Sequence, residues 1–319
     1  MASEEDVSKC FTGTHEVQEC LEGQGEADLH AHLVNCTKNP GHEGFLPIKC
    51  LAFGCNGDAL YDLTKTLADL TVRVAVKFTS PDRPEFVPGT KDPYPCYNTR
   101  GQNSLRTGTG RVGQVTKYTE GMKWGTYRTC PCPECEHSDT PSKEWWLVNV
   151  STATHVVFDS SEARQSSCRL WFDNDQSPVV NIYGWKICFA PVAGDTCWSY
   201  YVTHDVDIGS KLEEMVGRFN GLRRKLEDKY KSRRDVDKLT IIVSHPHGCS
   251  KQVSVGHWVH KEELDSQSRN SLTRYSYTTC TCPGTSGALV YKLGHGDLSN
   301  HPHSGANSGG LNYSALAFN

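Results

Sequence analysis

The sequence predicts a mostly β protein that combines many short strands, one long helix and a Cys/His-rich N-terminal region. From Gly108 onward, short runs rich in Val, Ile, Thr, Tyr and Trp are separated by Gly, Pro, Asn and Asp. This pattern is typical of a sandwich or barrel built from many strands. Residues 1–79 are instead rich in Cys and His, and residues 80–104 are rich in proline. A chain of 319 residues has room for two or three structural units.

Residues 1–104 contain one predicted helix and one extended connector. Leucines recur at helical spacing between residues 57 and 70, so we expect a helix there. The connector at residues 80–104 includes five prolines, which disfavour regular structure. We expect it to be extended and ordered only by docking against the rest of the chain.

A second helix interrupts the β pattern between two strand-rich regions, residues 105–208 and 236–319. Between residues 211 and 231 the apolar residues lie at i, i+3, i+4 and i+7 spacing, with Glu, Arg and Lys between them. We therefore assign residues 209–235 to a linker helix. Strand-like sequence resumes at Leu239.

Three segments supply a base, a carboxylate and a nucleophile, in the chain order His155, Asp205, Ser286. A serine hydroxyl needs an imidazole to take its proton, and the imidazole needs a carboxylate to fix its tautomer. Gly284 permits a tight turn that can aim the N–H groups of Gly284 and Ser286 at one point, as an oxyanion hole requires. Such chemistry needs no cofactor.

Four short motifs in this order resemble those of the chymotrypsin-like serine endopeptidases. Gly284-Thr285-Ser286-Gly287 is similar to the G-x-S-G nucleophile turn, and Thr152–Val157 is similar to the T-A-x-H segment. Asp205–Ile208 resembles the segment with the catalytic aspartate, and Gly108–Val112 resembles the opening of the first barrel. The resemblance covers roughly residues 105–319. It implies two six-stranded antiparallel β-barrels joined by the linker helix, and peptide hydrolysis through an acyl-enzyme.

The resemblance is closer to the HtrA, glutamyl endopeptidase and 3C-type branches than to the secreted trypsins. Thr285 stands where the secreted enzymes carry the aspartate that pairs with a new N-terminus, and no Ile-Val-Gly-Gly-like start precedes the barrel. Zymogen activation of that kind is therefore not expected.

Two assignments within the resemblance have alternatives. Asp207 lies two residues from Asp205, and Asp205 is preferred because Val206 and Ile208 then occupy the apolar positions of the motif. His303, in a His-x-Gly segment, resembles the imidazole that recognises Glu or Gln before the cleaved bond in glutamyl endopeptidases and 3C-type enzymes. The alternative is that residues 301–305 form a plain surface turn.

Two groups among the 15 cysteines have soft ligands close enough in sequence for structural zinc. The first group consists of Cys10, Cys20, His30, His32, Cys36, Cys50 and Cys55. The second consists of Cys130, Cys132 and Cys135. The alternative is a scatter of buried thiols, since free cysteine is among the most buried residue types.

Composition limits the partners. The net charge is −4, with 33 Lys and Arg against 37 Asp and Glu, so nucleic acid and anionic membrane are not expected. No apolar run reaches the length of a membrane span, and the acidic N-terminus does not resemble a signal peptide. We expect a cytoplasmic endopeptidase acting on a protein or peptide substrate. A pseudoprotease with the same barrels and a zinc-dependent interaction protein are the alternatives.

Overall fold

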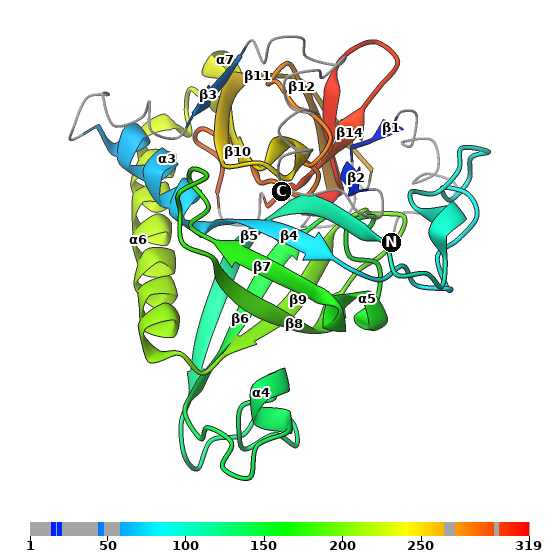
Figure 1. Ribbon diagram of the computed structural model, residues 1–319. Helices are drawn as coiled ribbons and strands as arrows, with labels where there is room; N and C mark the ends of the chain where they lie inside the picture. The colour runs from blue at the N-terminus through cyan, green and yellow to red at the C-terminus, as the bar shows by residue number, and fades with distance from the viewer. Residues whose placement is uncertain are drawn as a thin grey trace.

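The computed structural model describes residues 14–16, 18–20, 44–47, 58–264, 272–296 and 300–318. Two curled antiparallel sheets lie against each other, and a long helix runs along one side of both (Figure 1). The predicted mostly β fold with two barrel-like units is confirmed.

The first sheet closes into a six-stranded barrel in the order β5-β4-β7-β8-β9-β6, with β6 pairing back onto β5. The alternating valines of β4, Val72, Val74 and Val76, are fully buried in its core. The short strand β2 (Gln18–Cys20) pairs with the start of β5. The barrel strands are β4 (Thr71–Val76), β5 (Leu105–Tyr118), β6 (Trp145–Thr152), β7 (Ser166–Leu170), β8 (Val180–Phe189) and β9 (Cys197–Thr203).

The second sheet curls in the order β1-β14-β15-β12-β11-β10-β13, with β3 on β11 and β16 on β12. Its curl brings β13 back toward β14, where Val290 N donates to the His301 oxygen at 2.9 Å and His303 N donates to the Ala288 oxygen at 2.7 Å. The strands are β1 (Thr14–His15), β3 (Phe45–Pro47), β10 (Leu239–Ser244), β11 (Gln252–Glu263), β12 (Leu272–Tyr277), β13 (Val290–Lys292), β14 (His303–Ala306), β15 (Asn312–Ser314) and β16 (Ala317–Phe318).

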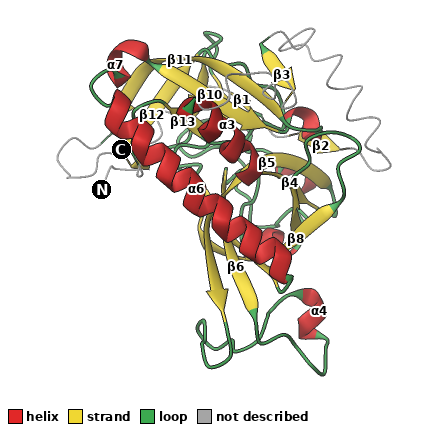
Figure 2. Cartoon of the chain, turned by 90° about the vertical axis from the view of Figure 1, so that its left-hand side faces the viewer, coloured by secondary structure: helices red, strands yellow, loops and turns green. Residues whose placement is uncertain are grey.

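Two of the helices occupy the positions predicted from apolar spacing. Helix α3 (Ala59–Leu70) buries Leu63, Leu67 and Leu70, and α6 (Val206–Tyr230) buries Leu212, Phe219 and Leu226. Figure 2 shows α6 lying across both barrels, as expected for a linker helix. Its glycine at 209 contacts the Trp146 indole of the first barrel, and the Tyr230 carbonyl at its end lies against Gly294 of the second.

The shorter helices are α4 (Pro133–Glu136) in the β5–β6 connection, α5 (Ser160–Arg164) before β7 and α7 (Arg234–Asp237) before β10. Single 3-10 turns lie at Tyr97–Thr99 and Pro246–Gly248. No helix among the described residues has the length and apolar character needed to cross a membrane.

The predicted boundary of the first barrel is too late in the chain. Strand β4, at residues 71–76, is a full member of that barrel, although we assigned the barrel to residues 105–208. The proline-rich connector is therefore a long excursion between two barrel strands. It docks as expected, because its Arg83 is fully buried.

Candidate active site

Ser286 lies in the loop between β12 and β13, in a turn that requires glycine. Gly284 has φ of +93°, and a Cβ at that position would come within 2.7 Å of the His245 carbonyl oxygen. Behind the turn, Thr109 N donates to the Ser286 oxygen and Thr109 Oγ1 donates to the Gly284 oxygen, both at 2.8 Å. The Gly108–Val112 motif thus supports the backbone of the nucleophile turn.

His155 follows β6 in a tight turn and faces Ser286. Val156 N and Val157 N both donate to the Ala153 oxygen, at 3.0 and 3.2 Å, and this closes the turn. The imidazole is fully buried. Its Nε2 lies 2.8 Å from Ser286 Oγ, within reach for proton transfer.

The carboxylate beside His155 belongs to Asp195, in the β8–β9 loop. The two carboxylate oxygens lie 2.9 and 2.8 Å from His155 Nδ1, and Oδ1 also accepts from the His155 backbone N–H at 3.0 Å. Ser304 Oγ donates to Oδ2 at 2.5 Å. Asp195 thus occupies the position that we predicted for Asp205.

Asp205 does not contact His155 and instead caps the start of a helix. It is the N-cap of α6, where its Oδ1 accepts from the N–H groups of Asp207 and Ile208 at 2.9 and 3.0 Å. Asp207 is exposed in the first turn of the same helix. The prediction was wrong because β9 ends at Thr203, so these residues begin a helix and do not form a strand.

Asp195 is held in its ionised form although it is buried. Burial alone would raise its pKa, but the His155 ring and the hydrogen bonds from His155 and Ser304 hold the pKa at about 2. An ionised acceptor at Nδ1 places the proton of a neutral imidazole on that nitrogen. Nε2 is then left free to accept the proton of Ser286.

A buried ion network fixes the backbone at His155. Both terminal nitrogens of Arg83 donate to the His155 carbonyl oxygen at 3.1 Å. Arg83 also pairs with Glu162, through Nε at 2.7 Å and Nη2 at 2.8 Å. Arg106 contacts the same carboxylate and donates to the Val156 oxygen at 3.0 Å. The docked connector therefore helps to position the base.

His303 lies next to the nucleophile turn and is fully buried, so residues 301–305 are not a plain surface turn. Gly287 N donates to the His303 carbonyl oxygen at 2.8 Å. The imidazole Nδ1 contacts Tyr277 Oη at 2.5 Å, and Nε2 lies 2.8 Å from Glu16 Oε2. With Nε2 donating to the carboxylate, Nδ1 accepts from the tyrosine hydroxyl.

The predicted oxyanion donors are the N–H groups of Gly284 and Ser286. The Gly284 N–H donates to the carbonyl oxygen of Glu16 at 2.7 Å. A peptide carbonyl is thus bound at the point where the glycine turn aims its backbone donor.

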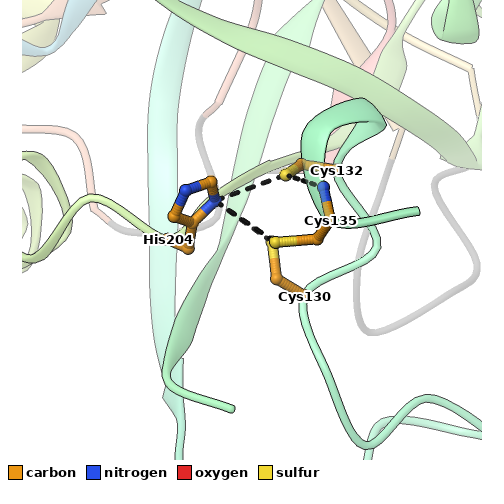
Figure 3. A group of neighbouring side chains, drawn as sticks. All are labelled: Cys130, Cys132, Cys135 and His204. Atoms are coloured by element: carbon orange, nitrogen blue, oxygen red, sulfur yellow. Dashed lines mark hydrogen bonds between the residues drawn. The ribbon is translucent and has the colours of Figure 1, made fainter. Parts of the chain in front are cut away.

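The second cysteine group gains a fourth member, which the sequence analysis did not select. The sulfur atoms of Cys130, Cys132 and Cys135 lie together on the Nδ1 side of the His204 ring, at distances of 3.9, 3.3 and 3.6 Å from Nδ1 (Figure 3). The cysteines come from the β5–β6 connection around α4, and His204 follows β9. On the other side of the ring, Nε2 lies 3.6 Å from Glu134 Oε2.

The predicted N-terminal ligands fall largely outside the described residues. This is true of Cys10, His30, His32, Cys36, Cys50 and Cys55. Cys20 belongs to β2, and its side chain is not among the described parts.

Comparisons with known proteins find partly similar solved structures, and no match among family profiles or curated proteins. No protein-family profile matches the chain, and no curated protein matches it. Among solved structures, the HtrA-type protease AlgW with a tripeptide covers 80% of this chain at 11% identity and a TM-score of 0.39. The active form of the Rv3671c protease from M. tuberculosis covers 79% at 10% identity and a TM-score of 0.40. The match spans 58% of the AlgW chain and 78% of the Rv3671c chain.

Proposed function

We propose that the protein is a serine endopeptidase whose triad consists of His155, Asp195 and Ser286. The observation that carries this proposal is the hydrogen-bond chain from Asp195 through His155 to Ser286 Oγ, with both links within 2.9 Å. Nucleophile, base and orienting carboxylate are all buried and in reach of one another.

Each residue has one role in the proposed reaction. Ser286 Oγ attacks the peptide carbonyl as His155 Nε2 takes its proton, and Asp195 stabilises the imidazolium that forms. The N–H groups of Gly284 and Ser286 receive the negative oxygen of the tetrahedral intermediate. His155 then gives its proton to the departing amine, and water hydrolyses the acyl-enzyme.

We further propose that the enzyme cleaves after Glu or Gln, with His303 as the residue that recognises this side chain. The support is the contact between His303 Nε2 and a glutamate carboxylate, in a position where both side chains are buried. Substrates without a polar acceptor would leave the His303 N–H unpaired, and polar pockets discriminate strongly for this reason.

The test of activity is labelling by a fluorophosphonate probe, followed by mass mapping of the labelled peptide. We expect Ser286 to be labelled in the wild-type chain and no label in Ser286→Ala. Because the Glu16 carboxylate contacts His303, the same assay on Glu16→Lys measures the site with this contact removed. Absence of label in both Ser286-containing chains would favour the pseudoprotease or the interaction protein.

We also propose that Cys130, Cys132, Cys135 and His204 bind a structural zinc ion. Tetrahedral bonds of about 2.3 Å to sulfur and about 2.05 Å to nitrogen would separate each sulfur from the ring nitrogen by about 3.6 Å. The three separations of 3.3 to 3.9 Å bracket this value. Glu134 near Nε2 is the carboxylate partner that zinc-binding histidines commonly have. The ion would join the β5–β6 connection to the end of β9, in a reducing compartment that keeps the thiols available.

Metal analysis of the purified chain tests the zinc proposal. We expect about one zinc per chain from this site, and a loss of one equivalent in Cys132→Ser together with a lower melting temperature. The matched control is Cys188→Ser, at an exposed cysteine outside the cluster. An equal metal content in wild type and Cys132→Ser would refute this site.

A further inference from the structure

The described residues of one N-terminal segment, 14–16 and 18–20, lie beside the catalytic residues. Its first part, β1, pairs antiparallel with β14 of the second sheet, with Thr14 opposite Ala306 and His15 opposite Gly305. Its last part, β2, pairs antiparallel with β5 of the first barrel. Figure 1 shows both short strands where the two sheets meet.

The Glu16 peptide carbonyl occupies the reaction centre between these two pairings. The Gly284 N–H, one of the two proposed oxyanion donors, binds this carbonyl oxygen at 2.7 Å. The Glu16 carboxylate reaches His303 Nε2 at 2.8 Å, and only 4% of the glutamate is exposed. Glu16 therefore makes both contacts expected of the residue before a cleaved bond.

The neighbours of Glu16 also contact the site. The His15 ring lies edge-on to His155 with centroids 4.5 Å apart, and its Nε2 is 3.8 Å from Asp195 Oδ2. Burial and the nearby His155 lower the His15 pKa to about 3, so this ring is neutral beside the base. Two residues after Glu16, the Gln18 side chain lies 2.9 Å from His247 Nδ1. Contacts on both sides of Glu16 fix the register of the segment.

We propose that the protein cleaves its own chain between Glu16 and Val17. This inference rests on the endopeptidase activity proposed above, and it identifies the chain's own segment around Thr14-His15-Glu16 as a substrate. Ser286 Oγ bonds to the Glu16 carbonyl carbon, and the bond to the Val17 nitrogen breaks as His155 Nε2 protonates that nitrogen. One water molecule then hydrolyses the ester, which leaves a carboxylate on Glu16, a free amine on Val17 and a restored Ser286 hydroxyl.

The experiment follows the intact mass and the N-terminal sequence of the purified full chain over time, at several protein concentrations. We expect a new N-terminus at Val17, formed with a rate constant that does not depend on concentration, because the Glu16 carbonyl of the same chain is already bound at the site. Ser286→Ala should form none. Glu16→Lys should slow the reaction by at least about 100-fold, since the pocket contact is lost. The matched control, Glu213→Lys on the exposed face of α6, should cleave at the wild-type rate.

A synthetic peptide with the sequence of residues 11–21, added to Glu16→Lys, separates failure of this inference from failure of the proposed function. If the wild-type chain stays intact while Glu16→Lys cuts the peptide, the enzyme is active and self-cleavage is refuted. If neither reaction occurs, both proposals fall. A new N-terminus elsewhere, or a rate constant that rises with protein concentration, would also overturn intramolecular cleavage after Glu16.

Discussion

Replacing Asp195 with Asn is the sharpest test of the proposed triad, because it changes one oxygen into an amide nitrogen at a fully buried position. The carboxylate accepts from His155 Nδ1, from the His155 backbone and from Ser304. Asparagine has a single acceptor oxygen for these donors. If its amide group faces Nδ1, the imidazole proton moves to Nε2, where it blocks attack by Ser286.

We expect kcat to fall on the order of 10⁴-fold, equivalent to about 5.4 kcal/mol of lost transition-state stabilisation. KM should change little, because Asp195 contacts the base, whereas the Glu16 carboxylate is bound by His303. The assay measures both constants on a peptide with glutamate before the cut. Circular dichroism and a melting curve check that the variant is folded.

Asp205→Asn provides the matched control, since it removes the same charge at the carboxylate favoured by the sequence motif. Asparagine caps a helix about as well as aspartate, so activity and stability should both stay close to wild type. The triad assignment fails if Asp195→Asn keeps more than a tenth of the activity. It also fails if Asp205→Asn loses as much as Asp195→Asn does.

Three further outcomes are expected. Ser286→Ala and His155→Ala should each lower kcat by about 10⁴-fold or more, and the double variant should be little worse than either single variant. If the two losses in kcat multiply in the double variant, the residues do not share one role. His303→Ala should lower kcat/KM for a glutamate peptide by about 100-fold or more relative to a leucine peptide, and an unchanged ratio would exclude it from recognition. Glu162→Gln should lower the free energy of unfolding by about 3–5 kcal/mol in urea titrations, because it leaves the buried Arg83 guanidinium without its carboxylate partner, and a loss below 1 kcal/mol would count against the network.

The sequence predicted the two central catalytic candidates because their surroundings are local. Ser286 lies in a turn formed by Gly284 and Gly287, which are within two residues of it in the chain. His155 lies in a turn closed by hydrogen bonds between residues within two positions of it. Asp195 is different, since its role depends on the β8–β9 loop returning to His155 from 40 residues away. The sequence offered one sign of this aspartate, because Gly194-Asp195 directly precedes a strand-like run of residues. A stronger motif match drew the prediction to Asp205, although Asp205 and Asp207 equally fit a helix start.

The cysteine cluster shows the same division between local and distant information. Cys130, Cys132 and Cys135 are recognisable as candidate ligands because they are close in sequence. The fourth member, His204, is 69 residues from Cys135 and joins them only because β6 and β9 are paired in the barrel. His137, nearer in sequence, is not in the cluster. The fourth member of such a cluster can be assigned only when the pairing of the strands is known.

The strands β1 and β2 could not have been predicted from periodicity, since two or three residues contain too little of a pattern. Their pairing is nevertheless what defines how a peptide crosses the site. β1 adds to the sheet that supplies Ser286 and His303, and β2 adds to the barrel that supplies His155 and Asp195. A peptide bound along both edges must therefore pass its backbone in front of the hydrogen-bonded pair of His155 and Ser286. In the proposed self-cleavage, the contact between Glu16 and His303 sets the register of the bound segment and so decides which peptide bond is cut.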